Sequence, residues 1–271
     1  MKRIYRFAGR VTEIDSLYDK VHEYCRGWLA DRVTSDAVEI RVRSTPEDLE
    51  LEGSRSDLPY IPSDEYLEEL AVYRQICEQM PFFDTILFHG SAIAVDGEAY
   101  LFTAPSGVGK STHARLWRTL LGDRATMVND DKPLIHMSEN GPIVYGTPWN
   151  GKHHLSTNMA SPLKAIGFIC RDEVNRICPL TGAYPKLLQQ VYRPFNPAAL
   201  SKTVHLIDLM SQAVDFYEIH CNMDPEAARI SFEGMSGKRL LMNLKQLTDR
   251  TVVVVTHRQA ALQLCDQVVH I

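Results

Sequence analysis

The sequence of 271 residues contains no run of about 18 apolar residues, and its first residues lack the apolar core of a secretion signal. We therefore expect no membrane insertion and predict a cytoplasmic protein. The formal net charge of -5 and the pI near 6.1 give no electrostatic reason to expect nucleic acid or an anionic membrane as the main partner. Any site for an anion must be local.

The cysteines also lack a pattern. All six are scattered, without a C-x-x-C pair or the spacing of metal ligands, so we interpret them as reduced, mostly buried thiols. The hydrophobic share of 45% and the charged share of 23% are ordinary for a globular protein, and a packed core is expected.

Residues 1–80 are predicted to form a small α+β lead-in unit. We expect a strand in 3–11, a helix in 13–30, a short strand in 37–42, a loop with at most one short strand in 44–65 and an amphipathic helix in 64–80. Tyr66, Leu70, Tyr73 and Cys77 share one face of that last helix, which Pro81 stops.

A different pattern begins at residue 84. Two apolar runs in 84–104 are separated by Asp-Gly, a dipeptide that favours a tight hairpin turn because both residues tolerate positive φ. The strand that leads into the next loop is therefore the second arm of an antiparallel hairpin. We predict an α/β fold with a mixed sheet rather than a purely parallel one.

The loop "APSGVGKS" matches the phosphate-binding pattern G-x-x-x-x-G-K-[ST] at its last three positions, with Ala104 where the pattern has glycine. Its backbone N–H groups and the following helix N-terminus favour phosphate oxygens. Lys110 would bridge the β and γ oxygens of ATP, and the Ser111 hydroxyl would hold Mg²⁺. The predicted nucleotide-binding residues are Ser106, Gly107, Val108, Gly109, Lys110, Ser111 and Thr112.

Asp130 and Asp131 follow a short apolar run about twenty residues after Lys110. Two adjacent carboxylates beside a phosphate site are costly unless a cation lies close to them. One would bind the metal and the other would accept the proton of an attacking hydroxyl; the residues alone leave the two roles open, and we take Asp131 with Ser111 as the metal ligands. The alternative is an exposed acidic turn.

These residues carry a resemblance. The segment from 84 to 235 resembles the HPr kinase/phosphorylase family, in which a His-Gly precedes the hairpin and an Asp-Asp pair follows the next helix and strand. His89, Lys110, Ser111, Asp130 and Asp131 match the motif positions. The resemblance implies a phosphoenolpyruvate carboxykinase-like P-loop fold, an aspartate that acts as general base toward a serine hydroxyl, and a histidine near the transferred phosphate.

Other candidate residues are less specific. Arg193 is a candidate for neutralising charge in the transition state, the alternative being a surface arginine at a Pro-rich helix end. Lys152, His153 and His154, in a segment rich in Gly, Pro and Asn, would touch phosphate or substrate or else lie in a solvated loop. After this segment we expect a hairpin in 163–180, helices in 184–192 and 198–212, a strand in 213–221 and a helix from 225.

The sequence thus predicts an ATP-dependent, Mg²⁺-requiring kinase that transfers the γ-phosphate to a hydroxyl, above all on Ser or Thr of a peptide or protein. A precursor peptide is one acceptor class, because short chains of this kind resemble HPr-kinase-like proteins of peptide-modification systems. Members of the HPr kinase/phosphorylase family also have a segment that recognises the carrier protein HPr. We find no such segment in this sequence, so transfer to HPr itself is not expected. Members of the family often form rings, so the resemblance is compatible with a homo-oligomer. The alternatives are a small-molecule kinase and a non-catalytic ATP-binding accessory of a peptide-modification or transport system.

The last part of the sequence carries a second resemblance. Residues 236–271 are similar to the end of an ABC-transporter ATPase domain, with His257 at the switch position, but no Leu-Ser-Gly-Gly signature precedes them. We interpret them as a fused fragment in which His257 is not catalytic; the alternative is that they dock on the main sheet as an extra strand and helix. The predicted organisation is therefore a lead-in unit (1–80), a kinase domain (81–235) and this fragment (236–271).

Overall fold

The structure is a computed structural model that describes residues 1–30, 32–55 and 60–237. The predictions for the ABC-like fragment, His257 included, fall almost entirely outside the described residues. Within these, no helix is both long and apolar enough to cross a membrane.

Nine strands form the main sheet. They are β4 (Thr85–Leu87), β5 (Ser91–Val95), β6 (Glu98–Thr103), β7 (Ala125–Asn129), β8 (Leu134–Ser138), β9 (Gly141–Tyr145), β10 (Ala160–Arg171), β11 (Arg176–Pro179) and β12 (Asp215–Cys221). The long strand β10 runs antiparallel to β9 at its start and parallel to β6 and β12 farther along. The predicted α/β class with a mixed sheet is confirmed.

The predicted hairpin before the phosphate loop is present. Strands β5 and β6 pair antiparallel, with Val95 opposite Glu98. Asp96 and Gly97 form the turn between them with φ of 52° and 87°, as a two-residue hairpin of this kind requires. The tight turn fixes the register and therefore the position at which β6 ends.

The second predicted hairpin is wrong. Strands β10 and β11 follow one another in the chain, but β12 lies between them, parallel to β10 and antiparallel to β11. Burial explains the arrangement, because β10 is continuously buried over residues 165–169 whereas β11 is short and largely exposed. A strand as apolar as β10 needs neighbours on both sides, and β11 is suited to an edge.

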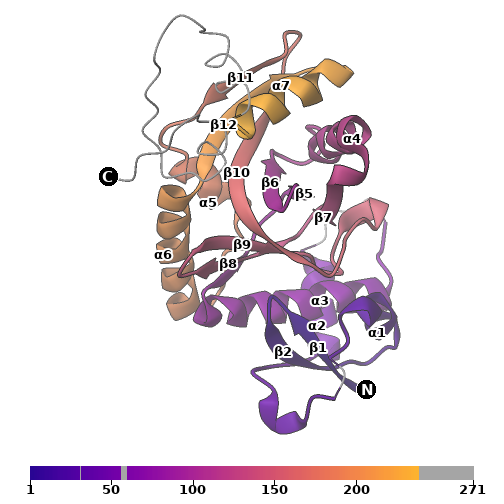
Figure 1. The fold of residues 1–271 in the computed structure, drawn as a ribbon. Helices are drawn as coiled ribbons and strands as arrows, with labels where there is room; N and C mark the ends of the chain where they lie inside the picture. The colour runs from indigo at the N-terminus through magenta and orange to yellow at the C-terminus, as the bar shows by residue number, and fades with distance from the viewer. Residues whose placement is uncertain (31, 56–59, 238–271) are drawn as a thin grey trace, which may run out of the picture.

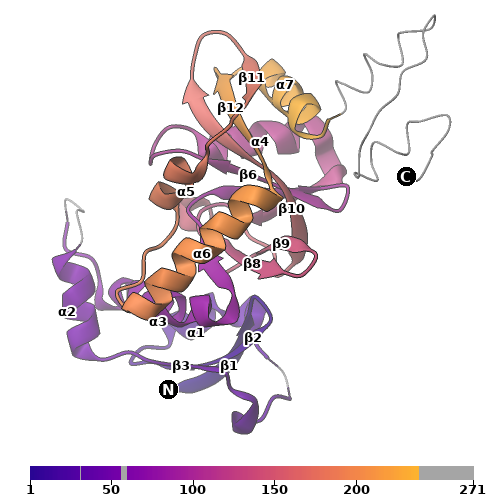
Figure 2. The same ribbon diagram turned by 90° about the vertical axis from the view of Figure 1, so that its left-hand side faces the viewer.

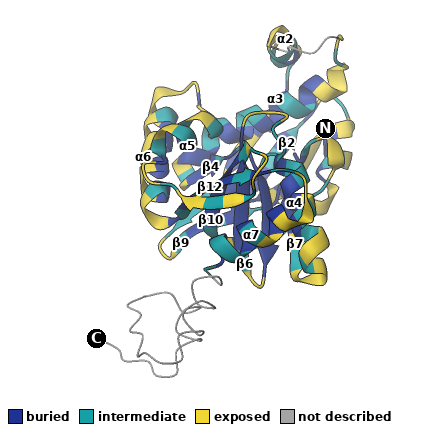
Figure 3. Cartoon of the chain, turned by 90° about the horizontal axis from the view of Figure 1, so that it is seen from above, coloured by how far each residue is buried: buried dark blue, intermediate teal, exposed yellow. Residues whose placement is uncertain are grey.

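Helices cover both faces of the sheet (Figures 1 and 2). Helices α4 (Lys110–Leu121) and α7 (Pro225–Met235) pack on one face, while α5 (Tyr184–Gln190) and α6 (Pro197–Ala213) pack on the other. The central strands are buried and the helices expose their outer faces, as Figure 3 shows. Helices α5 and α6 and strand β12 were predicted to within a few residues, and α7 begins at the predicted residue 225.

The N-terminal unit has a sheet of its own. It contains β1 (Lys2–Phe7), β2 (Arg10–Asp15), β3 (Ile40–Arg43), α1 (Lys20–Tyr24), α2 (Pro46–Ser54) and α3 (Asp64–Gln79). Three predictions for this unit were wrong. Residues 3–11 contain a hairpin rather than one strand, and 13–30 contain the end of β2, the short helix α1 and a 3-10 turn at Arg26–Trp28 instead of one helix. The predicted loop 44–65 contains α2, because Thr45 and Asp48 form a capping box and Pro46 takes the first turn.

Helix α3 joins this unit to the main sheet. The Tyr73 ring stacks on Trp149 with 4.0 Å between ring centroids, and the Tyr73 hydroxyl donates to the Lys132 carbonyl at 2.7 Å. The predicted apolar face of α3 is right for Tyr73 and Cys77, but Tyr66 is 42% exposed. The domain boundary at residue 80 stays a prediction.

Candidate active site

One edge of the sheet brings together most of the predicted site residues. Strands β6, β10 and β12 are parallel, so their carboxyl ends meet at this edge. Strand β5 is antiparallel to both β6 and β7, so the start of β5 and the end of β7 lie at the same edge. The strand order therefore brings together the phosphate loop, the histidine before β5 and the aspartates after β7 (Figure 1).

The loop after β6 has the geometry of a phosphate cradle. Gly107 and Gly109 have φ of 78° and 130°, which L-residues rarely adopt, and α4 begins at Lys110. Lys110 is buried, and its Nζ donates to the Ala104 carbonyl at 3.0 Å. Burial lowers the pKa of Lys110, and the charges of Asp131 and Asp130 act against that shift. The ammonium group is therefore close enough to both aspartates for their charges to act on it.

Ala104 takes the first position of the loop without strain. Its side chain is 3% exposed and belongs to the core cluster that also contains Ala114 and Trp117. Five described residues other than glycine have positive φ, and Ala104 is not among them. A methyl group therefore fits here, which accounts for the departure from the usual glycine.

Asn129 holds the turn that presents the aspartates. Its Oδ1 accepts from the backbone N–H of Asp131 at 2.9 Å and of Lys132 at 2.7 Å. Its Nδ2 donates to the carbonyl oxygen and the hydroxyl of Thr147, both at 3.0 Å. Asn129 is fully buried, so it fixes the turn from within the fold. The sequence analysis missed this residue, although an asparagine at a strand end before two acids favours such a turn.

Asp130 points into the protein and pairs with Ser111. Only 5% of Asp130 is exposed, and its carboxylate accepts from the Ser91 hydroxyl at 2.5 Å. Burial raises the pKa of Asp130, while hydrogen bonds from Ser91 and Ser111 and the nearby His153 lower it. The sequence analysis took Ser111 with Asp131 as metal ligands, whereas the structure brings Ser111 to Asp130.

Asp131 lies beside the predicted histidine. His89 Nε2 is 3.6 Å from Asp131 Oδ1, and the two side chains are 35% and 28% exposed. Burial and the charge of Lys110 lower the pKa of His89, and Asp131 acts in the opposite direction. Gln190 fixes the backbone of His89, since its carbonyl accepts from His89 N–H at 2.7 Å. The structure thus gathers His89, Lys110 and Asp131.

Arg193 is not gathered with these groups. The chain runs from Val191, opposite Phe88, to Tyr192, whose N–H donates to the Leu87 carbonyl, so it leads away from His89. Arg193 is exposed, and none of the described interactions joins it to the loop or the aspartates. None of the contacts of the described residues supports the predicted role of Arg193 in neutralising transition-state charge.

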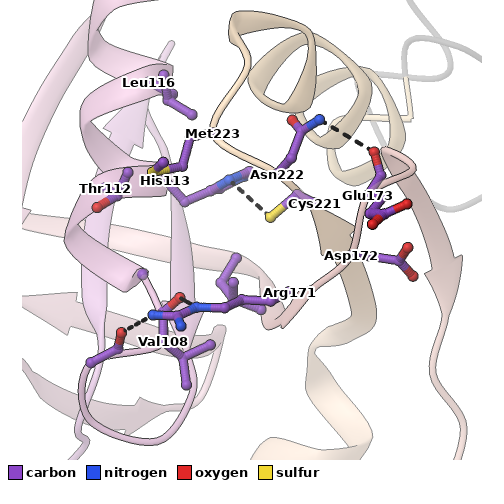
Figure 4. Close-up of a pocket in the computed structure, with 13 residues that line it drawn as sticks. Val108, Thr112, His113, Leu116, Arg171, Asp172, Glu173, Cys221, Asn222 and Met223 are labelled. Atoms are coloured by element: carbon purple, nitrogen blue, oxygen red, sulfur yellow. Dashed lines mark hydrogen bonds between the residues drawn. The ribbon is translucent and has the colours of Figure 1, made fainter.

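Arg171, at the end of β10, contacts the loop instead, and the sequence analysis missed it. Its guanidinium donates to the carbonyls of Gly107 at 2.5 Å and Val108 at 3.1 Å (Figure 4). These two bonds tie the loop to the central strand. The only feature of the sequence that could have indicated this role is an arginine at the end of an apolar strand.

We expect Arg171→Ala to weaken ATP binding about tenfold with a smaller change in kcat, because a loop that is no longer fixed must be ordered on binding. Calorimetric titration with ATP measures the effect. Arg124→Ala is the matched control, since Arg124 is an exposed arginine paired with Asp96 at the opposite end of the hairpin. Equal ATP affinity in the two variants would contradict a positioning role for Arg171.

A cavity of about 630 Å³ lies between the loop, α4 and the ends of β10 and β12. Its lining is apolar at Leu116, Ile169 and Met223, and Figure 4 shows Asn222 and Glu173 joined by a hydrogen bond at its rim. Its volume falls in the range of small-ligand pockets. A molecule seated here would contact the outer side of the loop.

His113 forms the inner wall of this cavity as a neutral base. The Ser231 hydroxyl donates to the Ala227 carbonyl and accepts from Trp117 Nε1 at 2.8 Å, so His113 Nε2, also at 2.8 Å, must donate to it. His113 Nδ1 is left without a proton and faces Cys221 Sγ at 3.8 Å (Figure 4). Burial lowers the pKa of His113 to about 4.

This histidine predicts loss of stability in acid. Because its pKa is about 4 in the folded protein and near 6.5 when unfolded, only the unfolded chain gains a proton between these values. The free energy of unfolding should fall by about 3 kcal/mol from this residue alone as the pH drops from 7 to 4. Denaturation of wild type and His113→Gln across this range should show the variant losing less, and parallel curves would contradict the assignment.

No family model matches the sequence, and no curated protein sequence matches it. Among the solved structures that match is one described as the Hpr(Ser) kinase/phosphatase from Coxiella burnetii, with 11% sequence identity and a TM-score of 0.31. The match covers 58% of this chain and 98% of that chain. At this TM-score, the fold assignment rests on the strand order described above.

Proposed function

We propose that the chain is an ATP-dependent kinase that transfers the γ-phosphate to a hydroxyl, above all on Ser or Thr of a peptide or protein. The observation that carries the proposal is the convergence of Lys110, Asp130, Asp131 and His89 at one sheet edge. A loop that only binds phosphate has no need of two carboxylates facing its lysine, because like charges there are costly. A site for transfer needs both a cation ligand and a base.

The donor set fits Mg²⁺ at Ser111 and Asp130. Asp130 is a buried carboxylate whose pKa is raised by burial, and a cation would offset this cost. Among the described residues no three His, Cys, Asp or Glu side chains form a metal-binding group. Mg²⁺ binds one or two carboxylates together with substrate phosphates, and a buried carboxylate beside a hydroxyl suits it. Bound there, Mg²⁺ would neutralise charge on the phosphate oxygens.

The remaining groups have separate tasks in this proposal. The loop amides and Lys110 hold the phosphates of ATP, and the cavity beside Arg171 takes the nucleoside. Asp131 accepts the proton of the acceptor hydroxyl while the new O–P bond forms and the bond to the β-phosphate oxygen breaks, releasing ADP. His89 stays neutral near pH 7 and keeps Asp131 oriented. Arg193 has no task here.

Incubation with γ-labelled ATP and Mg²⁺ tests the proposal and the acceptor class together. One reaction contains a pool of Ser- and Thr-containing peptides, and a parallel one contains a pool of hydroxyl metabolites. We expect acid-stable label in the peptide pool. Label in the metabolite pool alone would indicate a small-molecule kinase, and bound ATP without any labelled product would indicate a non-catalytic accessory.

A further inference from the structure

A second cavity lies beside the proposed Mg²⁺ ligands. It has a volume of about 350 Å³, and Ser111 and Asp130 are among its lining residues. One wall is α4 and the other is the turn that follows β9, from Gly151 to Leu155. The Asp130 N–H donates to the Leu155 carbonyl at 3.0 Å, so that wall is fixed to the aspartate turn.

Three basic side chains belong to the lining of this cavity. Arg115, Arg118 and Lys152 all lie on its walls, and Asp130 is the only acid among its lining residues. None of the hydrogen bonds or ion pairs of the described residues involves the side chain of any of the three. Elsewhere among the described residues, exposed cations such as Arg124 and Lys186 pair with nearby carboxylates.

The spacing of the two arginines places them along α4, away from Ser111. Ser111, Arg115 and Arg118 are four and then three positions apart, so they follow one face of α4. With a rise of about 1.5 Å per residue, the arginines lie about 6 and 10 Å beyond Ser111 along the helix. They are therefore past the place where Lys110 and Ser111 would hold the terminal phosphate. Lys152 lies on the opposite wall, so the two arginines belong to a cavity rather than to an open helix face.

We propose that this cavity, here called the basic channel, binds an acidic peptide, with a carboxylate side chain two or three residues from the Ser or Thr that is phosphorylated. An extended peptide advances about 3.3 Å per residue, so this separation spans the distance from Ser111 to the arginines. The inference rests on the proposed function and names the substrate class of the same site.

Matched peptides test the basic channel. Each peptide contains one serine and one Glu, which lies two or three residues before or after the serine. Its partner peptide has Gln in place of that Glu. We expect kcat/KM to be about tenfold higher for one Glu peptide than for its Gln partner, because two or three partly exposed ion pairs are worth about this much together. The advantage should shrink as salt is added.

Variants locate the effect. Arg115→Gln and Arg118→Gln should each reduce the preference for Glu, and Arg118→Glu should favour a Lys peptide instead. Arg124→Gln, an arginine paired at the far end of the sheet, should retain the full preference. Equal kcat/KM for the Glu and Gln peptides in wild type would overturn the inference while leaving the kinase proposal intact.

Binding separates this inference from the proposed function. Fluorescence anisotropy with the same labelled peptides and unhydrolysable ATP needs no catalysis, and we expect the same order of affinities even if no product forms. Phosphorylated metabolites are tested as competitors of the labelled peptide. If one of them binds wild type more tightly than the Glu peptide does and no longer competes in Arg118→Glu, the ligand of the basic channel is not a peptide.

Discussion

Asp131→Asn should lower kcat about a thousandfold while changing the affinity for ATP by no more than a few-fold. The amide has nearly the shape of the carboxylate but does not accept the proton of the acceptor hydroxyl, and general-base catalysis contributes about 10² to 10⁴ in rate. The turn should persist, because Asn129 holds it through the backbone N–H of residues 131 and 132. Steady-state kinetics and calorimetric ATP titration give the two quantities.

A matched control accompanies this variant. Asp123→Asn changes an exposed aspartate just beyond α4 and should leave kcat as in wild type. If Asp131→Asn phosphorylates at the wild-type rate, Asp131 is not the base. A loss of ATP binding together with kcat would instead place Asp131 in nucleotide binding, against the division of roles proposed here.

Lys110→Met should impair both catalysis and binding, with kcat/KM lower by at least about a hundredfold and ATP affinity reduced as well. Lys110 supplies charge-assisted hydrogen bonds to phosphate oxygens, which are among the strongest that a side chain makes. Methionine keeps much of the volume of the buried side chain. Kinetics and ATP titration measure both changes.

The stability of this variant separates a lost site from a lost fold. Burial lowers the pKa of Lys110, so its charge is held at a cost, and removing it should not lower the thermal unfolding temperature without ligand. Added ATP and Mg²⁺ should raise that temperature in wild type but not in the variant. An equal rise in both would remove Lys110 from the phosphate site.

The motif residues were predictable because their chemistry is local. A loop sequence, an Asp-Gly turn and a pair of aspartates each report a nearby backbone requirement, and the antiparallel hairpin β5–β6 followed from them. Helix α2 was missed because three prolines in 44–65 suggested a loop, although one of them, Pro46, begins a helix that Thr45 caps.

The rest of the site depends on contacts between distant segments. Arg171 reaches the loop only because β10 lies beside β6, and the pairing of Ser111 with Asp130 follows from β7 joining β5. Neither pairing is encoded in a local pattern. The same cause explains the wrong β10–β11 hairpin, since β12 comes from more than forty residues farther along the chain.

Mass spectrometry of the acceptor tests the central claim most directly. Wild type and Asp131→Asn are incubated with ATP, Mg²⁺ and the peptide pool, and ATP binding is measured in the same preparations. The account predicts peptides heavier by one phosphoryl group on Ser or Thr with wild type and almost none with the variant, at similar ATP affinity. ATP converted only to ADP and free phosphate, with every acceptor unmodified in both samples, would contradict it.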